Sequence, residues 1–214
     1  MKKVFLAAIA VCMYAGAIAQ ESKEEKINRM LKDGGEYVKE KKYKEAAASL
    51  QEGINIINEI LGAQILTGLP VSSSGLNCDV ANDQVTSLGT LMGAGMQVSR
   101  QYYNEEGKSI SLTLQPNSPQ LSSLNMFLDN KDDYPEGEVG KRVVVKEHKA
   151  LLRFNISADG EEGAAGVAYM SMPFYSSVIT FQGNGYKTEK EFLAFAESLD
   201  FDKLAVAMGF AKKE

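Results

Sequence analysis

Apolar and polar residues alternate with period two on both sides of a short turn between Met92 and Gln115. One set contains Met96, Val98, Arg100 and Tyr102, then Ile110, Leu112 and Leu114, and the other contains Gln97, Ser99 and Gln101, then Ser109, Ser111 and Thr113. This alternation is typical of two β-strands with one buried face. The intervening Asn104–Gly107 suits a short loop closed by a glycine. The pattern predicts a long β-hairpin that fixes a sheet, on which the other elements pack.

Between Ser22 and Gly62 the apolar spacing changes to three and four residues. Ile27, Met30, Leu31 and Val38 form one stripe, and Ala47, Leu50, Ile54, Ile57 and Leu61 form a second. This spacing predicts two amphipathic helices, and the short polar segment Lys39–Lys44 predicts that they fold back as an antiparallel hairpin. Ser22 with Glu25 makes a capping box at the start, and Gly62 is placed to end the second helix.

The rest of the chain mixes helical and strand signals. Residues 63–91 lose periodicity: Leu69-Pro70 and Ser72–Gly75 are interpreted as a linker or surface loop, and the segment 80–91 stays ambiguous. Ser118-Pro119 predicts the start of a helix. Four segments rich in β-branched and aromatic residues follow at 142–146, 150–156, 167–172 and 177–181, and the run Val143–Val145 indicates a strand covered on both faces. Thr188 with Glu191 forms a second capping box that opens a helix, and Asp200 or Asp202 caps a last short helix ended by Gly209.

Together these elements predict an α+β protein: an N-terminal helical hairpin and an antiparallel sheet of about six strands, with helices packed on one face. We assign residues 1–19 to a signal peptide, 20–66 to the helical hairpin and 67–214 to the α+β sheet domain. Because one helical hairpin of this size does not complete its own core, we expect the hairpin and the sheet to form one continuous core.

The first 19 residues have the three parts of a secretory signal. Lys2 and Lys3 give the positive start, an apolar run follows, and Ala17-Ile18-Ala19 is a small-x-small cleavage pattern before Gln20. The alternative is a lipoprotein anchored through Cys12, but Val11 stands where a lipobox needs a small residue. We expect cleavage after Ala19 and a periplasmic or secreted product that does not insert into a membrane.

Cleavage changes the charge and the cysteine content. Loss of Lys2 and Lys3 takes the formal net charge from −5 to −7, which disfavours binding to nucleic acid. Cys78 is the one cysteine left after Gln20, so no intramolecular disulfide is expected in the mature chain.

The helical hairpin resembles a single tetratricopeptide repeat. Gly34, Tyr37, Tyr43, Ala46 and Leu50 fall at the relative positions of that repeat's small, aromatic and packing residues. The chain departs from the repeat at Gly53, where alanine is usual, and in lacking a closing proline. The resemblance implies a peptide-binding groove as one possibility. We expect instead that the hairpin packs on the sheet, because such repeats need stacked neighbours.

Two further resemblances concern the rest of the chain. The order of hairpin, helix, strand run and terminal helix is loosely similar to the fold of PsbP-type photosystem subunits, an analogy of fold that carries no function. The signal peptide, Leu69-Pro70 and the GAGMQVSRQY strand look like those of small secreted bacterial proteins of unknown function. That likeness implies a periplasmic address.

Candidate chemistry is sparse, and we assign no catalytic, cofactor-binding or metal-binding residue. The single histidine, His148, lies among charged residues in a predicted turn, and one histidine with Cys78 does not assemble a zinc site. The acidic loops 130–138 and 159–163 lack the ligand spacing of calcium loops. Gly93-Ala94-Gly95 lacks the complete nucleotide fingerprint and precedes a strand rather than a helix.

Arg100 is the one charged residue on the apolar side of the predicted β-hairpin. We expect it to lie near the sheet edge and extend to water; the alternative is a buried guanidinium, which needs a carboxylate or carbonyl partner. Arg100, Tyr102, Tyr37 and Tyr43 are the candidate interaction positions.

The sequence therefore favours a protein without enzymatic activity that binds a small ligand or another envelope protein. Two alternatives stay open. One is a hydrolase-type enzyme whose carboxylates converge only in the fold, and the other is a structural accessory of an envelope complex. An exposed apolar stripe on the helices would favour docking to another protein.

Overall fold

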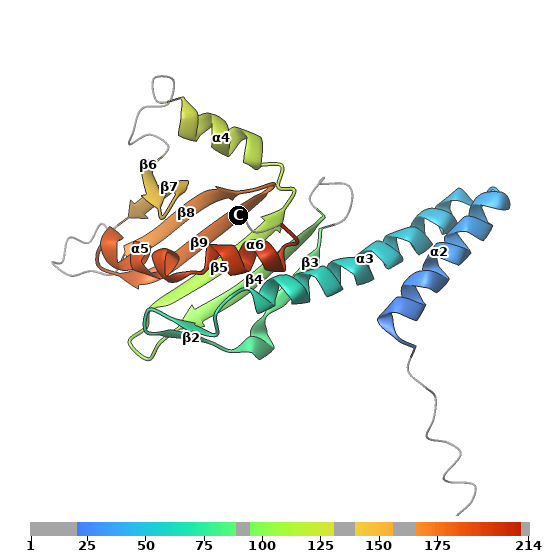
Figure 1. The fold of residues 1–214 in the computed structure, drawn as a ribbon, viewed down its shortest axis with the longest axis horizontal. Helices are drawn as coiled ribbons and strands as arrows, with labels where there is room; N and C mark the ends of the chain where they lie inside the picture. The colour runs from blue at the N-terminus through green and yellow to red at the C-terminus, as the bar shows by residue number, and fades with distance from the viewer. Residues whose placement is uncertain (1–20, 89–94, 131–139, 156–165, 211–214) are drawn as a thin grey trace, which may run out of the picture. The chain divides into compact units, whose positions relative to one another are not determined.

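The computed structural model describes residues 21–88, 95–130, 140–155 and 166–210 (Figure 1). The predicted signal peptide, Gly93-Ala94 and nearly all of both acidic loops lie outside these residues. The chain divides into two compact units, one ending at Ile56 and one beginning at Ile57. The prediction that hairpin and sheet share one core remains a prediction.

The first unit is the predicted antiparallel helical hairpin. Helix α2 covers Lys23–Lys39, and α3 covers Tyr43–Thr67, its first part lying in this unit. The capping box is confirmed: the Ser22 hydroxyl accepts from the backbone N–H of Glu25 at 3.1 Å, and the Glu25 carboxylate accepts from that of Ser22 at 2.8 Å. Lys41 has a positive φ of 59°, so the chain reverses between the helices within three residues.

Small residues bring α2 and α3 close together. A Cβ on Gly34 would lie 3.0 Å from the Leu50 side chain, and Ala46 is buried. The Ser49 hydroxyl donates to the Met30 carbonyl at 2.8 Å. The close approach of the two backbones and this buried hydrogen bond join the helices, and the exposed ion pair between Lys26 and Glu52 adds a further contact.

Gly62 does not end the second helix, which continues to Thr67. A Cβ at this position would lie 2.3 Å from Cγ1 of Val85. The glycine thus allows α3 to pack closely against a strand of the second unit, a role that glycine spacing alone does not distinguish from a helix end.

Among the described residues, the second unit contains one antiparallel sheet of nine strands, in the order β1-β2-β4-β5-β9-β8-β7-β6, with β3 also paired to β4. The strands are β1 Ser72–Ser73, β2 Leu76–Cys78, β3 Gln84–Ser87, β4 Met96–Tyr103, β5 Ser109–Pro116, β6 Lys141–Val145, β7 His148–Asn155, β8 Gly166–Phe174 and β9 Ser177–Tyr186. The α+β class is confirmed. The sheet has more strands than the six that the sequence predicted. Strands β1 to β3 were missed because they are two to four residues long, too short to show a clear period.

The central β-hairpin is confirmed in its register. Val98 pairs with Leu114 and Tyr102 with Ile110. The loop is closed by Gly107, whose φ is +83°, and the Asn104 side-chain oxygen accepts from the backbone N–H groups of Glu106 and Lys108. This loop chemistry fixes which face of both strands is buried.

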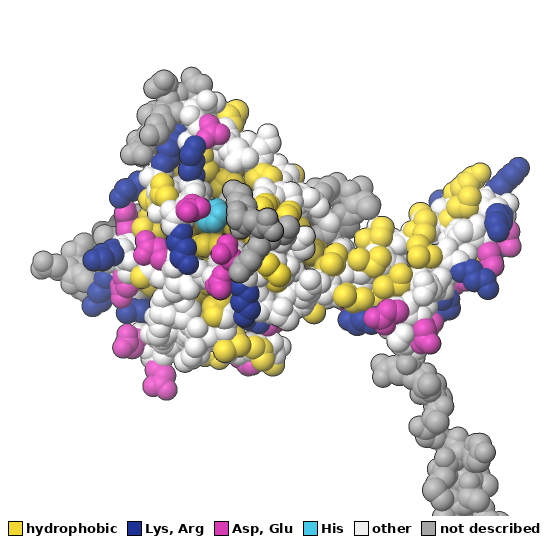
Figure 2. Space-filling model, in the orientation of Figure 1, with side chains coloured by type: hydrophobic (Ala, Val, Ile, Leu, Met, Phe, Trp, Pro, Cys, Tyr) yellow, Lys and Arg dark blue, Asp and Glu magenta, His cyan; other side chains and the backbone are white. Residues whose placement is uncertain are grey.

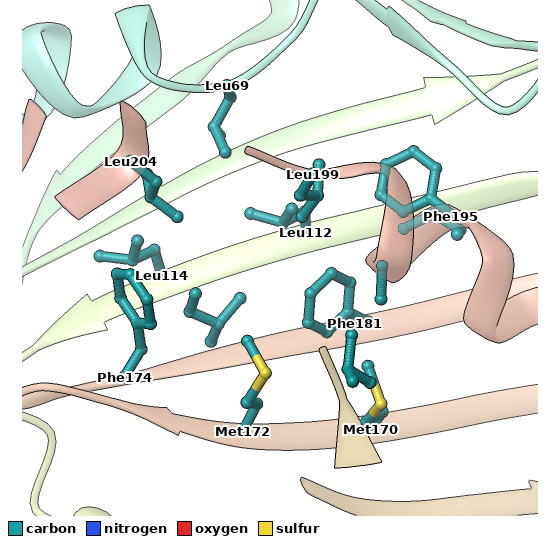
Figure 3. Packing of buried hydrophobic residues seen from close by; sticks show 14 of the residues in the cluster. Leu69, Leu112, Leu114, Met170, Met172, Phe174, Phe181, Phe195, Leu199 and Leu204 are labelled. Atoms are coloured by element: carbon teal, nitrogen blue, oxygen red, sulfur yellow. The ribbon is translucent and has the colours of Figure 1, made fainter. Parts of the chain in front are cut away.

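One face of the sheet carries the main core (Figure 3). Helices α5 (Glu189–Ser198) and α6 (Phe201–Ala207) and the end of α3 contribute to it, with Phe195, Leu204 and Ile65 fully or nearly buried. The caps at Thr188 and Asp200 are confirmed, each accepting from a backbone N–H of the first turn. Glu191 differs from the expected box, because its carboxylate accepts from the N–H of Lys187.

Helix α4 (Leu121–Asp129) lies on the opposite face, so the expectation of helices on one face alone was wrong. Leu124 and Leu128 pack on Val178, which has the opposite orientation to the core residues of β9. The helix begins two residues after the predicted Ser118-Pro119 start, because the Ser118 hydroxyl accepts from the N–H of Gln120 in a preceding turn.

Strand β6 is the last strand in the pairing order and is not covered on both faces. Val145 is fully buried, but Val144 is 64% exposed. The apolar run Val143–Val145 was therefore misread, since an edge strand can be as rich in valine as a central one. A short 3-10 helix, η1 (Val80–Asn82), precedes β3.

Candidate functional site

Arg100 is buried and fully engaged within the protein, contrary to the expectation that it extends to water. Its Nε and one terminal nitrogen donate to the two carboxylate oxygens of Asp83 at 2.8 and 2.5 Å. The other terminal nitrogen donates to the carbonyls of Leu69 and Pro70. The hydrogen bond to Asp83 raises the pKa of Arg100 above its ordinary value, so the guanidinium stays charged.

The pairing of β3 with β4 explains this contact. Gln84 lies opposite Ser99, so Asp83, the residue before, lies beside Arg100. Tyr102 adds to the same arrangement, because its buried hydroxyl donates to the Pro70 carbonyl at 2.9 Å and its ring contacts Phe195 edge-on. Arg100 and Tyr102 thus hold the Leu69–Pro70 segment against the sheet and are not surface contact residues.

The other two candidate positions lie elsewhere. Tyr37 is half-buried in α2, and Tyr43, the first residue of α3, is 65% exposed. Both belong to the helical hairpin, whereas Arg100 and Tyr102 belong to the sheet. Each unit therefore contains two of the four candidate positions.

His148 and Cys78 lie on different strands of the sheet, β7 and β2. His148 is the first residue of β7, half-buried, with its ring edge-on to Phe174 and Phe201 rather than in a solvated turn. Cys78 is on β2 and has a free thiol. Among the described residues, no group of three or more His, Cys, Asp or Glu side chains is placed to hold a metal ion.

The surface that stands out is the sheet face opposite the main core, on the four adjacent strands β4, β5, β9 and β8. Sixteen side chains on this face alternate with the core residues, and all except Val178, which is buried beneath α4, are at least partly exposed. They are Gln97, Ser99, Gln101, Tyr103, Ser109, Ser111, Thr113, Gln115, Val178, Thr180, Gln182, Asn184, Val167, Tyr169, Ser171 and Pro173. None of these sixteen is an acid or a base of the Asp, Glu, Lys, Arg or His type. We call this surface the open face.

The register aligns these side chains in rows across the strands. One row runs through Gln101, Ser111, Gln182, Tyr169 and Arg153 of β7, and the next through Ser99, Thr113, Thr180, Ser171 and Leu151. Neighbouring strands are about 4.8 Å apart, so a row of five strands spans about 19 Å. Each row therefore presents hydroxyl and amide groups at regular intervals.

Two hollows lie along the open face. One, of about 380 Å³, is lined by Gln101, Tyr103, Ser109, Ser111, Gln182 and Asn184 among others. The other, of about 180 Å³, lies beside α4 and is lined by Phe127, Arg153, Tyr169 and Ser171 among others. Gln182 and Tyr169 are cross-strand partners, so the two hollows meet at adjacent positions.

Two tyrosines stand on this surface with a large part of their side chains in solvent. Tyr103 on β4 is 49% exposed, and Tyr169 on β8, at the opposite side of the open face, is 43% exposed. An exposed tyrosine offers a flat apolar ring and a polar tip. The open face thus combines aromatic surface with neutral hydrogen-bonding groups, and it contains no carboxylate or imidazole for acid–base chemistry.

A separate hollow of about 260 Å³ lies at one end of the sheet, lined by Ile65, Met96, Asn117, Ser177, Met208 and Phe210 among others. The Ser177 hydroxyl is fully buried, and within the described part of the chain it has no hydrogen-bond partner. No lining residue of this hollow is ionisable. It is small and mostly apolar, and we assign no ligand to it.

The sequence predicted the polar positions on two of the four strands of the open face. It identified the polar alternation of β4 and β5 but gave it no role. The polar positions of β9 and β8 join it only through strand order and register, which the sequence does not state. The available signal was the lack of charge in segments 97–103, 109–115 and 178–184, apart from the buried Arg100.

Comparison with known proteins adds no relative: no protein-family model matches the chain, and the search of curated proteins returns no match. Within the described residues, none of the helices combines the length and apolar character needed to cross a membrane.

Proposed function

We propose that this protein is a non-enzymatic binding protein of the periplasm or the extracellular space, and that its open face binds a neutral, hydroxyl-rich ligand such as an oligosaccharide. The observation that carries this proposal is the set of sixteen uncharged side chains on four adjacent strands. Surfaces of small domains are ordinarily about 25–35% charged residues, so a charge-free face of this size is unusual.

The hydrogen-bonding groups match such a ligand. Gln and Asn side chains each carry donors and an acceptor, and Ser and Thr hydroxyls are both donor and acceptor. Sugar hydroxyls have the same dual character. Gln101, Gln182 and Asn184 in the larger hollow are therefore suited to neighbouring hydroxyls of one sugar ring.

The aromatic groups match the other part of a sugar. One face of a pyranose ring is lined with C–H groups, and these pack on aromatic rings. Tyr103 and Tyr169 provide exposed rings at two separate points of the open face. Neighbouring strands lie about 4.8 Å apart, so the four strands of the open face span about 14 Å, which accommodates an oligosaccharide rather than a single ring.

The electrostatics disfavour charged ligands at this surface. Arg153 of β7 borders the open face, but the sixteen positions themselves carry no cation to pair with phosphate or carboxylate. They also carry no pair of carboxylates, which the common mechanisms of glycoside hydrolysis require. This supports binding over hydrolysis at the open face.

The test is calorimetric titration of the chain from Gln20 with maltohexaose, cellohexaose and xylohexaose, with oligogalacturonate as the anionic comparison. We expect one neutral oligosaccharide to bind and oligogalacturonate not to. Gln101→Ala with Gln182→Ala, and separately Tyr169→Ala, should each weaken binding about tenfold or more, which corresponds to about 1.4 kcal/mol.

Tyr43→Ala is the matched control, because it removes an exposed tyrosine of the helical hairpin rather than of the open face. It should leave the affinity unchanged. Absence of binding to all three neutral oligosaccharides, or binding that the open-face variants do not weaken, refutes the proposal.

A further inference from the structure

The part of the helical hairpin in the first unit leaves five large apolar side chains in solvent: Leu31, Val38, Tyr43, Leu50 and Ile54, each between 38% and 65% exposed. Figure 2 shows hydrophobic side chains gathered along these helices. Leu31, Val38, Leu50 and Ile54 belong to the two predicted stripes, whereas Met30 of the first stripe is buried and Tyr43 was not part of either stripe. We call the five exposed side chains the hairpin surface.

These side chains lie on one side of the hairpin. Leu31 and Val38 are seven residues apart on α2, and Tyr43 and Leu50 are seven apart on α3, the spacing of a coiled-coil seam. The Leu50 side chain lies over Gly34. Since Gly34 is one turn from both Leu31 and Val38, the rows of the two helices are neighbours.

The charges of residues 21–56 point to a second copy as the partner. This segment holds eight lysine or arginine residues and eight aspartate or glutamate residues, so its net charge is zero. The excess negative charge of the mature chain, −7, falls in residues 57–214. Two hairpins therefore approach each other without net repulsion.

The distribution along the hairpin favours an antiparallel arrangement. The turn end, residues 36–45, has four basic and three acidic residues, for a charge of +1. The open end, residues 21–33 with Glu52, has four basic and five acidic residues, for a charge of −1. A two-fold axis across the hairpin surface places the turn end of one copy against the open end of the other.

A standard interface buries about 800 Å² on each partner, so the five apolar side chains would form its centre and neighbouring polar residues would contribute the rest. Interfaces surround an apolar centre with a polar rim, and the flanking lysines and glutamates supply that rim. We propose that two copies of this chain associate through the hairpin surface to form an antiparallel four-helix bundle.

Sedimentation velocity of the chain from Gln20 over a range of concentrations tests this. We expect a dimer that dissociates on dilution, and a monomer for Leu50→Glu with Ile54→Glu. Leu31→Lys is a milder second variant, because this side chain is more than half exposed, and it should weaken the dimer at least tenfold.

Val206→Glu is the matched control, since Val206 is a 49% exposed apolar residue of α6 in the second unit. It should leave the dimer intact, and far-UV circular dichroism should show unchanged helix content in all variants. A chain that is monomeric at every concentration, or a dimer that survives all three hairpin substitutions, overturns the proposal. Because these substitutions lie outside the open face, oligosaccharide binding is measured independently on the same proteins.

Discussion

Gly35 in α2 and Gly62 in α3 both lie inside helices, but a methyl group at each meets different surroundings. Nothing lies within 4 Å of a Cβ at Gly35, whereas Val85 occupies that space at Gly62. We expect Gly35→Ala to raise the free energy of unfolding by about 0.5–1 kcal/mol, because alanine favours the helix. Gly62→Ala should lower it by about 1–3 kcal/mol through overpacking. Urea denaturation measures both changes.

The double variant Gly62→Ala with Val85→Ala separates overpacking from other causes. Truncating Val85 opens the space that the added methyl group needs, so the double variant should be more stable than Gly62→Ala alone. A double variant less stable than both single variants contradicts the close approach of α3 to β3.

Tyr102 makes stability depend on pH in the alkaline range. Burial raises the pKa of Tyr102 to about 12, above the ordinary value of 10, so the folded state retains the phenol proton more strongly than the unfolded state. The stability from this difference is fully present below pH 10 and is lost as the pH rises to 12. Tyr102→Phe should cost about 1 kcal/mol below pH 10, because the hydrogen bond to Pro70 is lost.

The difference between wild type and Tyr102→Phe should therefore shrink between pH 10 and pH 12, which urea denaturation at several pH values measures. Burial also raises the pKa of Tyr186 to about 12, so the variant keeps part of the alkaline sensitivity. A difference that stays constant with pH would show that the Tyr102 hydroxyl titrates normally.

Local signals predicted single-residue roles well where the partner is close in sequence. The capping pair Ser22 and Glu25 is three residues apart, and its bonds follow from helix geometry. Arg100 was misplaced because its partners, Asp83 and Leu69, are 17 and 31 residues away. Only the pairing of β3 with β4 brings Asp83 beside it, and β3 was not recognised in the sequence.

At the scale of elements, long periodic segments were predicted and short or edge segments were not. The β4–β5 hairpin has eight residues in each strand, enough for the alternation to fix its register. Strands β1 to β3 are too short to show a period, and β6 was assigned a buried position from composition alone. Sheet order is a long-range property, so it decides edge position where the valine content of β6 does not.

The Arg100 side chain on β4 binds two short parts of the chain, and the sequence did not reveal these contacts. One part is Asp83, which directly precedes β3, and the other is the Leu69–Pro70 segment. Asp83→Ala should lower the free energy of unfolding by about 3–5 kcal/mol, because it leaves a buried guanidinium without its carboxylate. Thermal and urea unfolding measure the loss.

Arg100→Met with Asp83→Leu is the informative comparison for this pair. Replacing both charges with apolar side chains removes the uncompensated charge, so this double variant should be more stable than Asp83→Ala. Equal stability of the two would indicate that the hydrogen bonds to Leu69 and Pro70, rather than the buried charge, dominate the energy.

At the scale of the whole molecule, the surfaces depend on strand order and register, which the sequence shows only in part. Strand order and register assemble the open face from segments 97–103, 109–115, 178–184 and 167–173, and its lack of charge becomes visible only then. The sequence showed the apolar stripes of the hairpin surface but did not show that these side chains are exposed. An apolar stripe is equally typical of a helix that packs on a sheet.

Export is a property of the whole chain that its first residues predict. Fractionation with N-terminal sequencing should find a mature protein beginning at Gln20, in the periplasm or the medium. Palmitate labelling that depends on Cys12 would contradict this and indicate a lipid-anchored protein instead.

The division at Ile56 makes a last prediction about how far the sheet unit extends into α3. Residues 57–67 belong to this unit: Ile65 is buried in its core, Leu66 packs against that core, and the Asn58 side chain donates to the Gly95 carbonyl at 2.9 Å. A fragment 57–214 should therefore be soluble and melt cooperatively. A fragment 69–214 lacks Ile65 and Leu66, and because loss of one large buried side chain costs about 2–5 kcal/mol, it should melt at a much lower temperature or aggregate. Equal melting of the two fragments would show that α3 is dispensable to the sheet, whereas failure of both would support one core that includes the helical hairpin.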